Sequence, residues 1–127
     1  MLAGTGLCPT GTCVMGLTLD QLATVARKHT SRKVTVLRGL SAAAFREQMR
    51  LSNDPKRRYV INFTRKPIFG GGGGHHSPIG GYLEKEDLVF VLDVNRDYGP
   101  WLIERDRLFA AQDTLDGDKK RGMLRIE

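Results

Sequence analysis

The sequence contains little cysteine, little tryptophan and no long apolar run, and each shortage excludes a class of protein. Its 2 cysteines, Cys8 and Cys13, are too few and too close together to form the disulfide framework of a small secreted domain. No apolar run approaches the roughly 20 residues that a membrane-spanning helix needs. The first residues lack the basic and apolar regions of a secretory signal. We therefore expect a soluble, cytoplasmic protein with no membrane partner.

The charged residues are unevenly divided, with 20 Lys and Arg against 14 Asp and Glu, for a net charge of +6. A basic protein attracts anionic partners, which include small acidic molecules as well as nucleic acids. Binding of single-stranded nucleic acid usually needs aromatic side chains interleaved with the basic ones, and the chain has 1 Trp. No nucleic acid partner is therefore predicted. The length of 127 residues suits one domain or a piece of one.

The hydrophobic pattern predicts an α+β fold with a mainly antiparallel sheet. Thr18 and Gln21 have the spacing of a capping box, which predicts a helix over residues 19–29. Residues 1–15 show no period and are expected to be irregular, whereas residues 16–127 form the domain. The other predicted elements are strands at 33–37, 59–63, 77–83, 88–94 and 121–126, a helix capped by Ser41 and a helix at 104–115.

The strongest strand prediction ends in a carboxylate that needs a partner. Residues 88–94 form a nearly continuous apolar run, which indicates burial on both faces, and Asp93 lies within it. His75 follows a run of glycines at 70–74, where its ring could reach an open cleft. An Asp that accepts a hydrogen bond from such a His can orient it as the base of a Cys-His-Asp triad. From spacing alone, a structural His–Asp hydrogen bond is the commoner explanation.

Three other site hypotheses are weaker. A phosphate-binding loop at 70–74 would need a following Gly-Lys-Ser/Thr, and two histidines stand there instead. Zinc bound by Cys8, Cys13, His75 and His76 would need a closer cysteine pair, so no metal site is predicted. Cys13 as a nucleophile would need a placed base and a lowered pKa.

Three stretches resemble the phytochelatin synthase family. Residues 74–82 read Gly-His-His-Ser-Pro-Ile-Gly-Gly-Tyr, where the family has Gly-His-Phe-Ser-Pro-Ile-Gly-Gly-Tyr. Residues 92–96 read Leu-Asp-Val-Asn-Arg and resemble the family's Leu-Asp-Val-Ala-Arg. Residues 120–124 are similar to its closing Arg-Gly-Phe-Met-Leu segment. His75 precedes Asp93 by eighteen residues, which is also the family's spacing between its catalytic His and Asp.

The resemblance implies a papain-like fold and gives each matching residue a role. His75 would be the catalytic base, Asp93 would orient it, and Arg96 and Tyr82 would be substrate-binding or structural residues near the site. His76 stands at the family's Phe position and receives no catalytic role. Neither Cys8 nor Cys13 has the sequence context of the family's nucleophile, so the resemblance predicts a chain that lacks the cysteine-bearing lobe.

The implied activity is acyl transfer between two glutathione molecules. The γ-glutamylcysteinyl group of one glutathione would pass to a second, with release of glycine, as part of heavy-metal detoxification. No tightly bound cofactor is expected, because Cd and Zn ions would arrive as glutathione thiolates. The expected partners are glutathione, the missing cysteine-bearing lobe and, in a homodimer, a second copy of the chain. The alternative is a non-catalytic remnant or a glutathione-binding module without a nucleophile.

Overall fold

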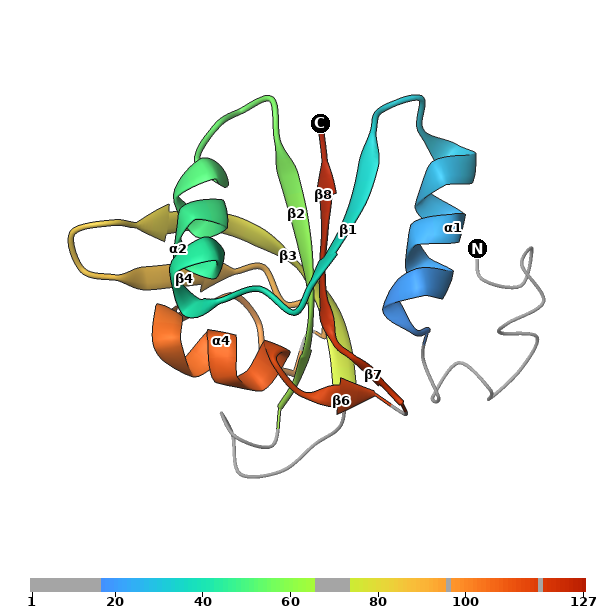
Figure 1. The fold of residues 1–127 in the computed structure, drawn as a ribbon. Coiled ribbons are helices and arrows are strands. Elements are labelled where there is room, and N and C mark those ends of the chain that lie inside the picture. Colours follow the sequence, from blue (N-terminus) through green and yellow to red (C-terminus); the bar gives the residue numbers. More distant parts are fainter. Residues whose placement is uncertain (1–16, 66–73, 96, 117) are drawn as a thin grey trace.

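A six-stranded sheet in the order β1-β8-β2-β3-β4-β5 organises the molecule (Figure 1). The structure, a computed structural model, describes residues 17–65, 74–95, 97–116 and 118–127. The strands of the sheet are β1 (Val34–Arg38), β2 (Arg58–Thr64), β3 (Gly74–Leu83), β4 (Leu88–Val91), β5 (Trp101–Glu104) and β8 (Gly122–Ile126). A separate ribbon consists of β6 (Leu115–Asp116) and β7 (Lys119–Lys120). All strand pairs are antiparallel, which confirms the α+β class.

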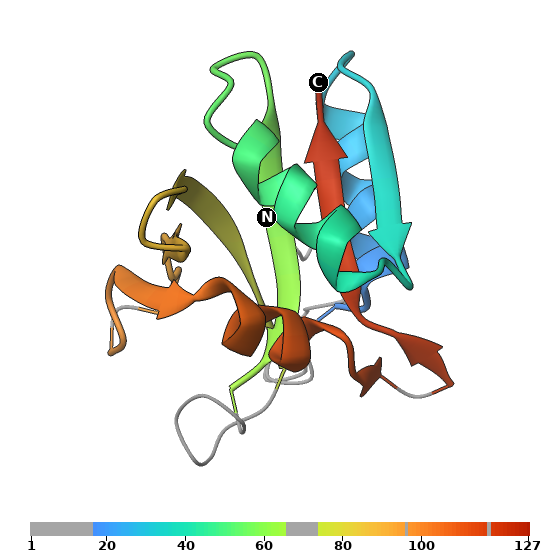
Figure 2. The same cartoon turned by 60° about the vertical axis from the view of Figure 1, so that its left-hand side comes forward.

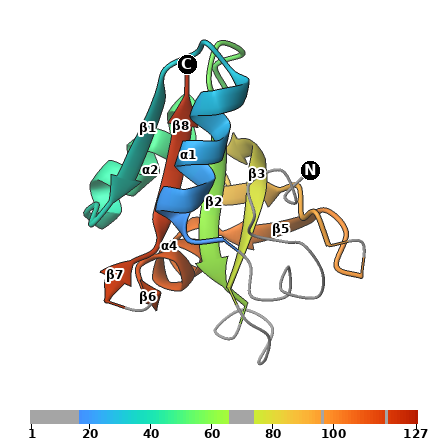
Figure 3. The ribbon, with the colours of Figure 1, turned by 90° about the vertical axis from the view of Figure 1, so that its right-hand side faces the viewer.

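Helix α1 (Leu19–His29) covers one face of the sheet at β1 and β8 (Figure 3). Thr18 Oγ1 accepts a hydrogen bond from the backbone N–H of Gln21, and Gln21 Oε1 accepts one from the N–H of Thr18. The predicted capping box is therefore confirmed, and it fixes where the helix begins. The buried residues between this helix and the sheet are Leu19, Ala23, Val34 and Leu124.

Helices α2 (Ala42–Leu51) and α4 (Arg105–Gln112) cover the opposite face of the sheet (Figures 1 and 2). Ser41 caps α2 as predicted, because its Oγ accepts a hydrogen bond from the N–H of Ala44. The main hydrophobic core lies on this face. Its buried members are Phe45, Met49, Tyr59, Ile61, Phe63, Ile79, Tyr82, Val89, Val91, Ile103, Leu108, Ala111 and Met123.

The alternation of side chains along β2 determines what the site contains. Tyr59, Ile61 and Phe63 point into the main core, and Asn62 points to the side of the sheet that carries α1. The same period of two continues past the end of the strand to Arg65, whose side chain is 1% exposed. A cation is thereby carried into the main-core side of the sheet, where it requires a counter-ion.

Strand β4 differs from the prediction in length and in burial. It ends at Val91, so Asp93 follows the strand instead of lying in it. Val89 and Val91 are buried, whereas Phe90 is half-buried and Leu92 is 39% exposed, so the predicted burial on both faces is wrong. The physical reason is that α2 and α4 cover one face here, while α1 lies over β1 and β8 on the other.

Three short strands and one helix boundary also differ from the prediction. Strands β5, β6 and β7 were not expected, because two to four residues are too few to establish a period of two. The helix expected at 104–115 is the shorter α4, which ends at Gln112. None of the described helices is both long enough and apolar enough to span a membrane.

Candidate functional site

The two histidines of β3 face opposite sides of the sheet. In the antiparallel register of β2 and β3, His75 lies opposite Phe63 and His76 lies opposite Asn62. Because directly opposite residues share a face, His75 is on the side of Phe63 and Arg65 and His76 is on the side of Asn62. His75 therefore lies on the main-core side of the sheet and His76 lies on the side of α1.

The carboxylate of Asp93 is completely buried and accepts four hydrogen bonds. Arg65 donates two of them, from Nη2 to Oδ1 at 2.8 Å and from Nη1 to Oδ2. The indole Nε1 of Trp101 donates to Oδ2 at 2.9 Å, and the backbone N–H of Asn95 donates to Oδ1 at 2.9 Å. A carboxylate offers about four lone-pair positions, so this one is saturated.

These donors determine the ionisation of Asp93. Burial by itself would raise the pKa of the carboxyl, because it penalises the charged form. The hydrogen bonds from Arg65, Trp101 and Asn95, together with the charge of Arg65, outweigh that effect and lower the pKa below its ordinary value. Asp93 is therefore an anion throughout the neutral pH range.

The guanidinium of Arg65 lies in an aromatic surrounding. Its central carbon is 3.9 Å from the ring centroid of Tyr98 and 5.4 Å from that of Phe63. Trp101 packs edge-on against Phe63, with ring centroids 5.7 Å apart and an interplanar angle of 75°. Cation–π contacts of this kind favour a charged guanidinium away from water. Asp93 and Arg65 therefore form a rigid, buried ion pair at the end of the sheet that carries His75.

Both charges of that ion pair shift the pKa of His75. Burial lowers the pKa of its imidazole first, the positive charge of Arg65 lowers it further, and the negative charge of Asp93 raises it in part. The structure thus brings His75, Arg65 and Asp93 together. The hydrogen bonds of Asp93, however, go to Arg65, Trp101 and Asn95, and the described contacts include none from His75 to Asp93.

The structure places the remaining predicted residues elsewhere. Tyr82 is seven positions beyond His75 on β3, which corresponds to roughly 20 Å. Its hydroxyl donates to Asp87 and accepts from Arg46 at 3.3 Å, so the structure does not bring it to the imidazole. Arg96, Cys8 and Cys13 lie outside the described residues, and so does most of the glycine run at 70–74.

Sequence reasoning missed two residues that hold Asp93. Arg65 could have been found, because it continues the alternation of Tyr59, Ile61 and Phe63 and so falls on the buried face. Trp101, the second of them, packs edge-on against Phe63. Its indole N–H also binds the carboxylate, and no sequence pattern indicates that hydrogen bond.

His76 occupies an unfavourable place for an ionisable ring on the α1 side of the sheet. Its Nε2 is buried and has no hydrogen-bond partner within the part of the chain that the structure describes, and the same holds for the side-chain nitrogen of Asn62 opposite. Burial lowers the pKa of His76 to about 4, and the charges of Asp116, His75 and Arg121 modify that shift. The ring is therefore neutral near pH 7.

We expect this ring to make stability depend on pH. Between the ordinary pKa of 6.5 and the folded value of about 4, the unfolded chain binds a proton at His76 that the folded chain does not. The free energy of unfolding should therefore fall by about 3 kcal/mol as the pH decreases through this window. The variant His76→Phe should remove this loss in urea unfolding at several pH values.

The matched control for that measurement is His29→Phe, because His29 is exposed at the end of α1. It should leave the pH dependence as in the unmodified chain. An unchanged acid slope in His76→Phe would show that another group causes the loss.

Among the residues that the structure describes, no three His, Cys, Asp or Glu side chains converge in a way that could hold a metal ion. The chemistry available at the site on the main-core side is that of an imidazole beside a buried ion pair. Such a group can accept and return a proton, and a negative charge beside it stabilises the protonated ring.

Known proteins share long stretches of this sequence. The sequence pattern of the phytochelatin synthases matches residues 10–123. Glutathione γ-glutamylcysteinyltransferase 3 of Lotus japonicus is 30% identical over 106 residues, covering 81% of this chain and 22% of the relative. The enzyme of that name from Schizosaccharomyces pombe is 31% identical over 117 residues, covering 88% of the chain and 28% of the relative.

A shorter match has higher identity. Glutathione γ-glutamylcysteinyltransferase 1 of Arabidopsis thaliana is 41% identical over 72 residues, which is 54% of this chain and 15% of the relative. In the two longer matches the chain spans 22% and 28% of the length of its curated relatives. These relatives are therefore several times longer than the segment that they share with this chain.

Proposed function

Because the chain belongs to the phytochelatin synthase family, we propose that it supplies the His75 and Asp93 half of a glutathione γ-glutamylcysteinyltransferase. The other half, a lobe with a nucleophilic cysteine, would complete a papain-like fold. The observation that carries the proposal is the location of His75 within electrostatic reach of the saturated carboxylate of Asp93, at one end of the sheet.

In the proposed reaction, His75 takes the proton from the cysteine thiol as the sulfur attacks the cysteinyl carbonyl carbon of glutathione. The peptide bond to glycine breaks, and the glycine amine leaves with the proton that His75 returns. The amine of a second glutathione then attacks the thioester, again losing its proton to His75, and the cysteine is released. If water attacks instead, the products are γ-glutamylcysteine and glycine.

The two charges of the ion pair act on the pKa of His75 in ways that suit both acceptance and return of a proton. Burial and the positive charge of Arg65 lower the pKa of the ring, which keeps it neutral and able to accept a proton near pH 7. The charge of Asp93 favours the imidazolium once the proton has arrived. In this proposal Asp93 acts by its charge and by fixing Arg65, since its lone pairs are already occupied.

The remaining predicted features are part of the same proposal. Arg96 directly follows Asn95, whose N–H donates to Asp93, and the proposal keeps for it the substrate-binding or structural role that the resemblance implies. Metal ions enter as thiolates of the second glutathione, and the reaction then responds to heavy metals through its substrate. No metal held by the chain itself is needed for either step.

The experiment joins this chain to the part of the Schizosaccharomyces pombe relative that precedes its match, and measures glycine release from glutathione. We expect glycine to appear together with either γ-glutamylcysteine or a longer γ-glutamylcysteinyl peptide, which separates hydrolysis from transfer. A folded fusion protein that binds glutathione but releases no glycine would contradict the transferase proposal and favour a non-catalytic glutathione-binding module.

A further inference from the structure

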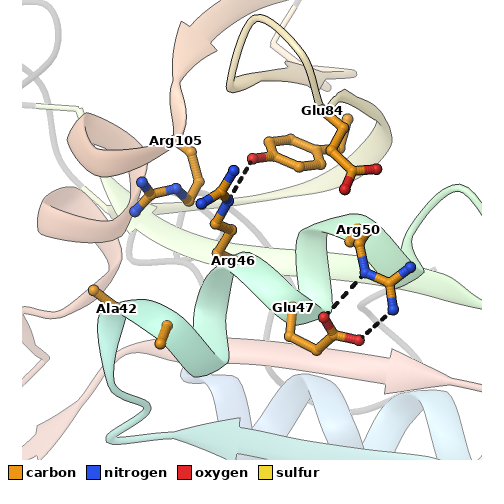
Figure 4. A pocket seen from close by; sticks show the side chains of 8 residues that line it. Ala42, Arg46, Glu47, Arg50, Glu84 and Arg105 are labelled. Carbon is orange, nitrogen blue, oxygen red and sulfur yellow. Dashed lines mark hydrogen bonds and ion pairs between the residues drawn. The ribbon is translucent and has the colours of Figure 1, made fainter.

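An open cavity of about 420 Å³ lies between α2, the end of β3 and the start of α4. It is distant from the proposed catalytic site, because Tyr82 in its wall is seven residues along β3 from His75. Figure 4 shows its charged side chains converging from the different elements. The residues that line it are Ala42, Ala43, Arg46, Glu47, Arg50, Tyr82, Glu84 and Arg105.

Among the described residues, Arg46 differs from the other two arginines of this cavity because it pairs with no carboxylate. Arg50 pairs with Glu47 at 2.7 Å, and Arg105 pairs with Asp87 at 3.0 Å. Arg46 donates its Nε to the hydroxyl of Tyr82 at 3.3 Å, and neither of its Nη groups has a partner among the described residues. A guanidinium with both Nη groups available has the planar fork that binds a carboxylate with two hydrogen bonds.

The wall behind Arg46 is held in place. Tyr82 is 4% exposed and donates its hydroxyl proton to Asp87, which also accepts two hydrogen bonds from Arg105 at 3.0 Å. Those bonds from Arg105, together with the bond from Tyr82, lower the pKa of Asp87 despite the opposing effect of burial. The Nε of Arg46 is therefore directed by a fixed hydroxyl, and its Nη groups are left for a ligand.

The opposite rim of the cavity is negative. The side chain of Glu84 is exposed, its carboxylate has no hydrogen-bond partner among the described residues, and its charge stabilises the charged form of Arg50 on the same side of the opening. Figure 4 shows Glu47, Arg50 and Glu84 on one side, and Arg46 with Arg105 on the other. A ligand with only negative charge, such as phosphate, would use the arginines and leave Glu84 without a partner. A ligand with a carboxylate and an ammonium a few atoms apart complements both rims.

We propose that this cavity binds the zwitterionic α-amino-acid group of a small molecule. Arg46 would hold the carboxylate and Glu84 would hold the ammonium. Free amino acids carry this group, and so do γ-glutamyl peptides such as glutathione. The proposal is independent of the transferase reaction, because it concerns binding at a place roughly 20 Å from His75.

The experiment follows backbone amide NMR shifts of the 127-residue chain during titration with L-glutamate, glutarate, glutathione and inorganic phosphate. Glutarate matches glutamate in length but lacks the ammonium, so it should bind about tenfold more weakly. Phosphate should bind still more weakly. Tighter binding of glutathione assigns the site to γ-glutamyl peptides, and tighter binding of glutamate assigns it to free amino acids.

Two variants test the residues by different means. Arg46→Gln should weaken glutamate binding about tenfold while its amide can still contact Tyr82. Ala43→Glu introduces a carboxylate into the cavity at the first turn of α2, where an acidic residue suits the helix, and should weaken binding similarly. The control Arg58→Gln removes an exposed arginine outside the cavity and should leave the affinity for glutamate unchanged. Equal binding of glutamate, glutarate and phosphate, or full affinity in both cavity variants, would overturn the proposal.

Discussion

The variant Arg65→Met is expected to lower the free energy of unfolding by about 3–5 kcal/mol, as measured by urea unfolding at neutral pH. The substitution keeps an apolar chain of similar length in the aromatic surrounding of Phe63 and Tyr98. It leaves Asp93 charged, with a side chain that is 0% exposed and no longer has its counter-ion. The penalty of an unpaired buried carboxylate therefore dominates the result.

Two further variants separate this explanation from a simple packing defect. Arg50→Met removes an exposed ion pair with Glu47 and should change the free energy of unfolding little. Adding Asp93→Leu to Arg65→Met removes the orphaned charge and should recover part of the lost stability. If Asp93→Leu lowers the free energy of unfolding as much in the Arg65→Met variant as in the unmodified chain, the ion pair is not the source of the effect.

A second large effect is expected in turnover. In the fusion protein that restores a cysteine-bearing lobe, His75→Ala should lower the rate of glycine release by roughly a hundredfold to ten-thousandfold. The reason is that the thiol loses the base that deprotonates it and the leaving amine loses its acid. Glutathione binding should change little, so kcat should fall far more than KM rises.

The control for turnover is His29→Ala, which replaces an exposed imidazole on α1. Its rate should match that of the unmodified fusion protein. If His75→Ala were equally active, the proposed base would have to be a different residue, and the role carried over from the family would be wrong for this chain.

Local sequence patterns predicted the elements that depend on short-range interactions. The capping box of Thr18 and Gln21 gave the correct bounds of α1, and the cap at Ser41 gave the start of α2. The strand predicted at 59–63 corresponds to β2. Each of these features depends on hydrogen bonds or side-chain directions within a few residues, which a sequence displays directly.

The partners of Asp93 could not be predicted in the same way. Its carboxylate joins Arg65, which is 28 positions earlier in the sequence, to Trp101, which is 8 positions later, and both contacts arise from how β2, β4 and β5 are arranged in the sheet. The hydrophobic run at 88–94 also hid the end of β4, because apolar residues continue after the strand has finished. The sequence identified an Asp that needs a partner, and the fold supplied a different partner from His75.

The measurement that tests this account most directly is the titration of His75 by NMR, compared between the unmodified chain and Asp93→Asn. If His75, Arg65 and Asp93 form one electrostatic unit, His75 titrates below 6.5 in the unmodified chain, and loss of the negative charge at 93 lowers its pKa further. A pKa of His75 that stays at its ordinary value in both proteins would contradict the account.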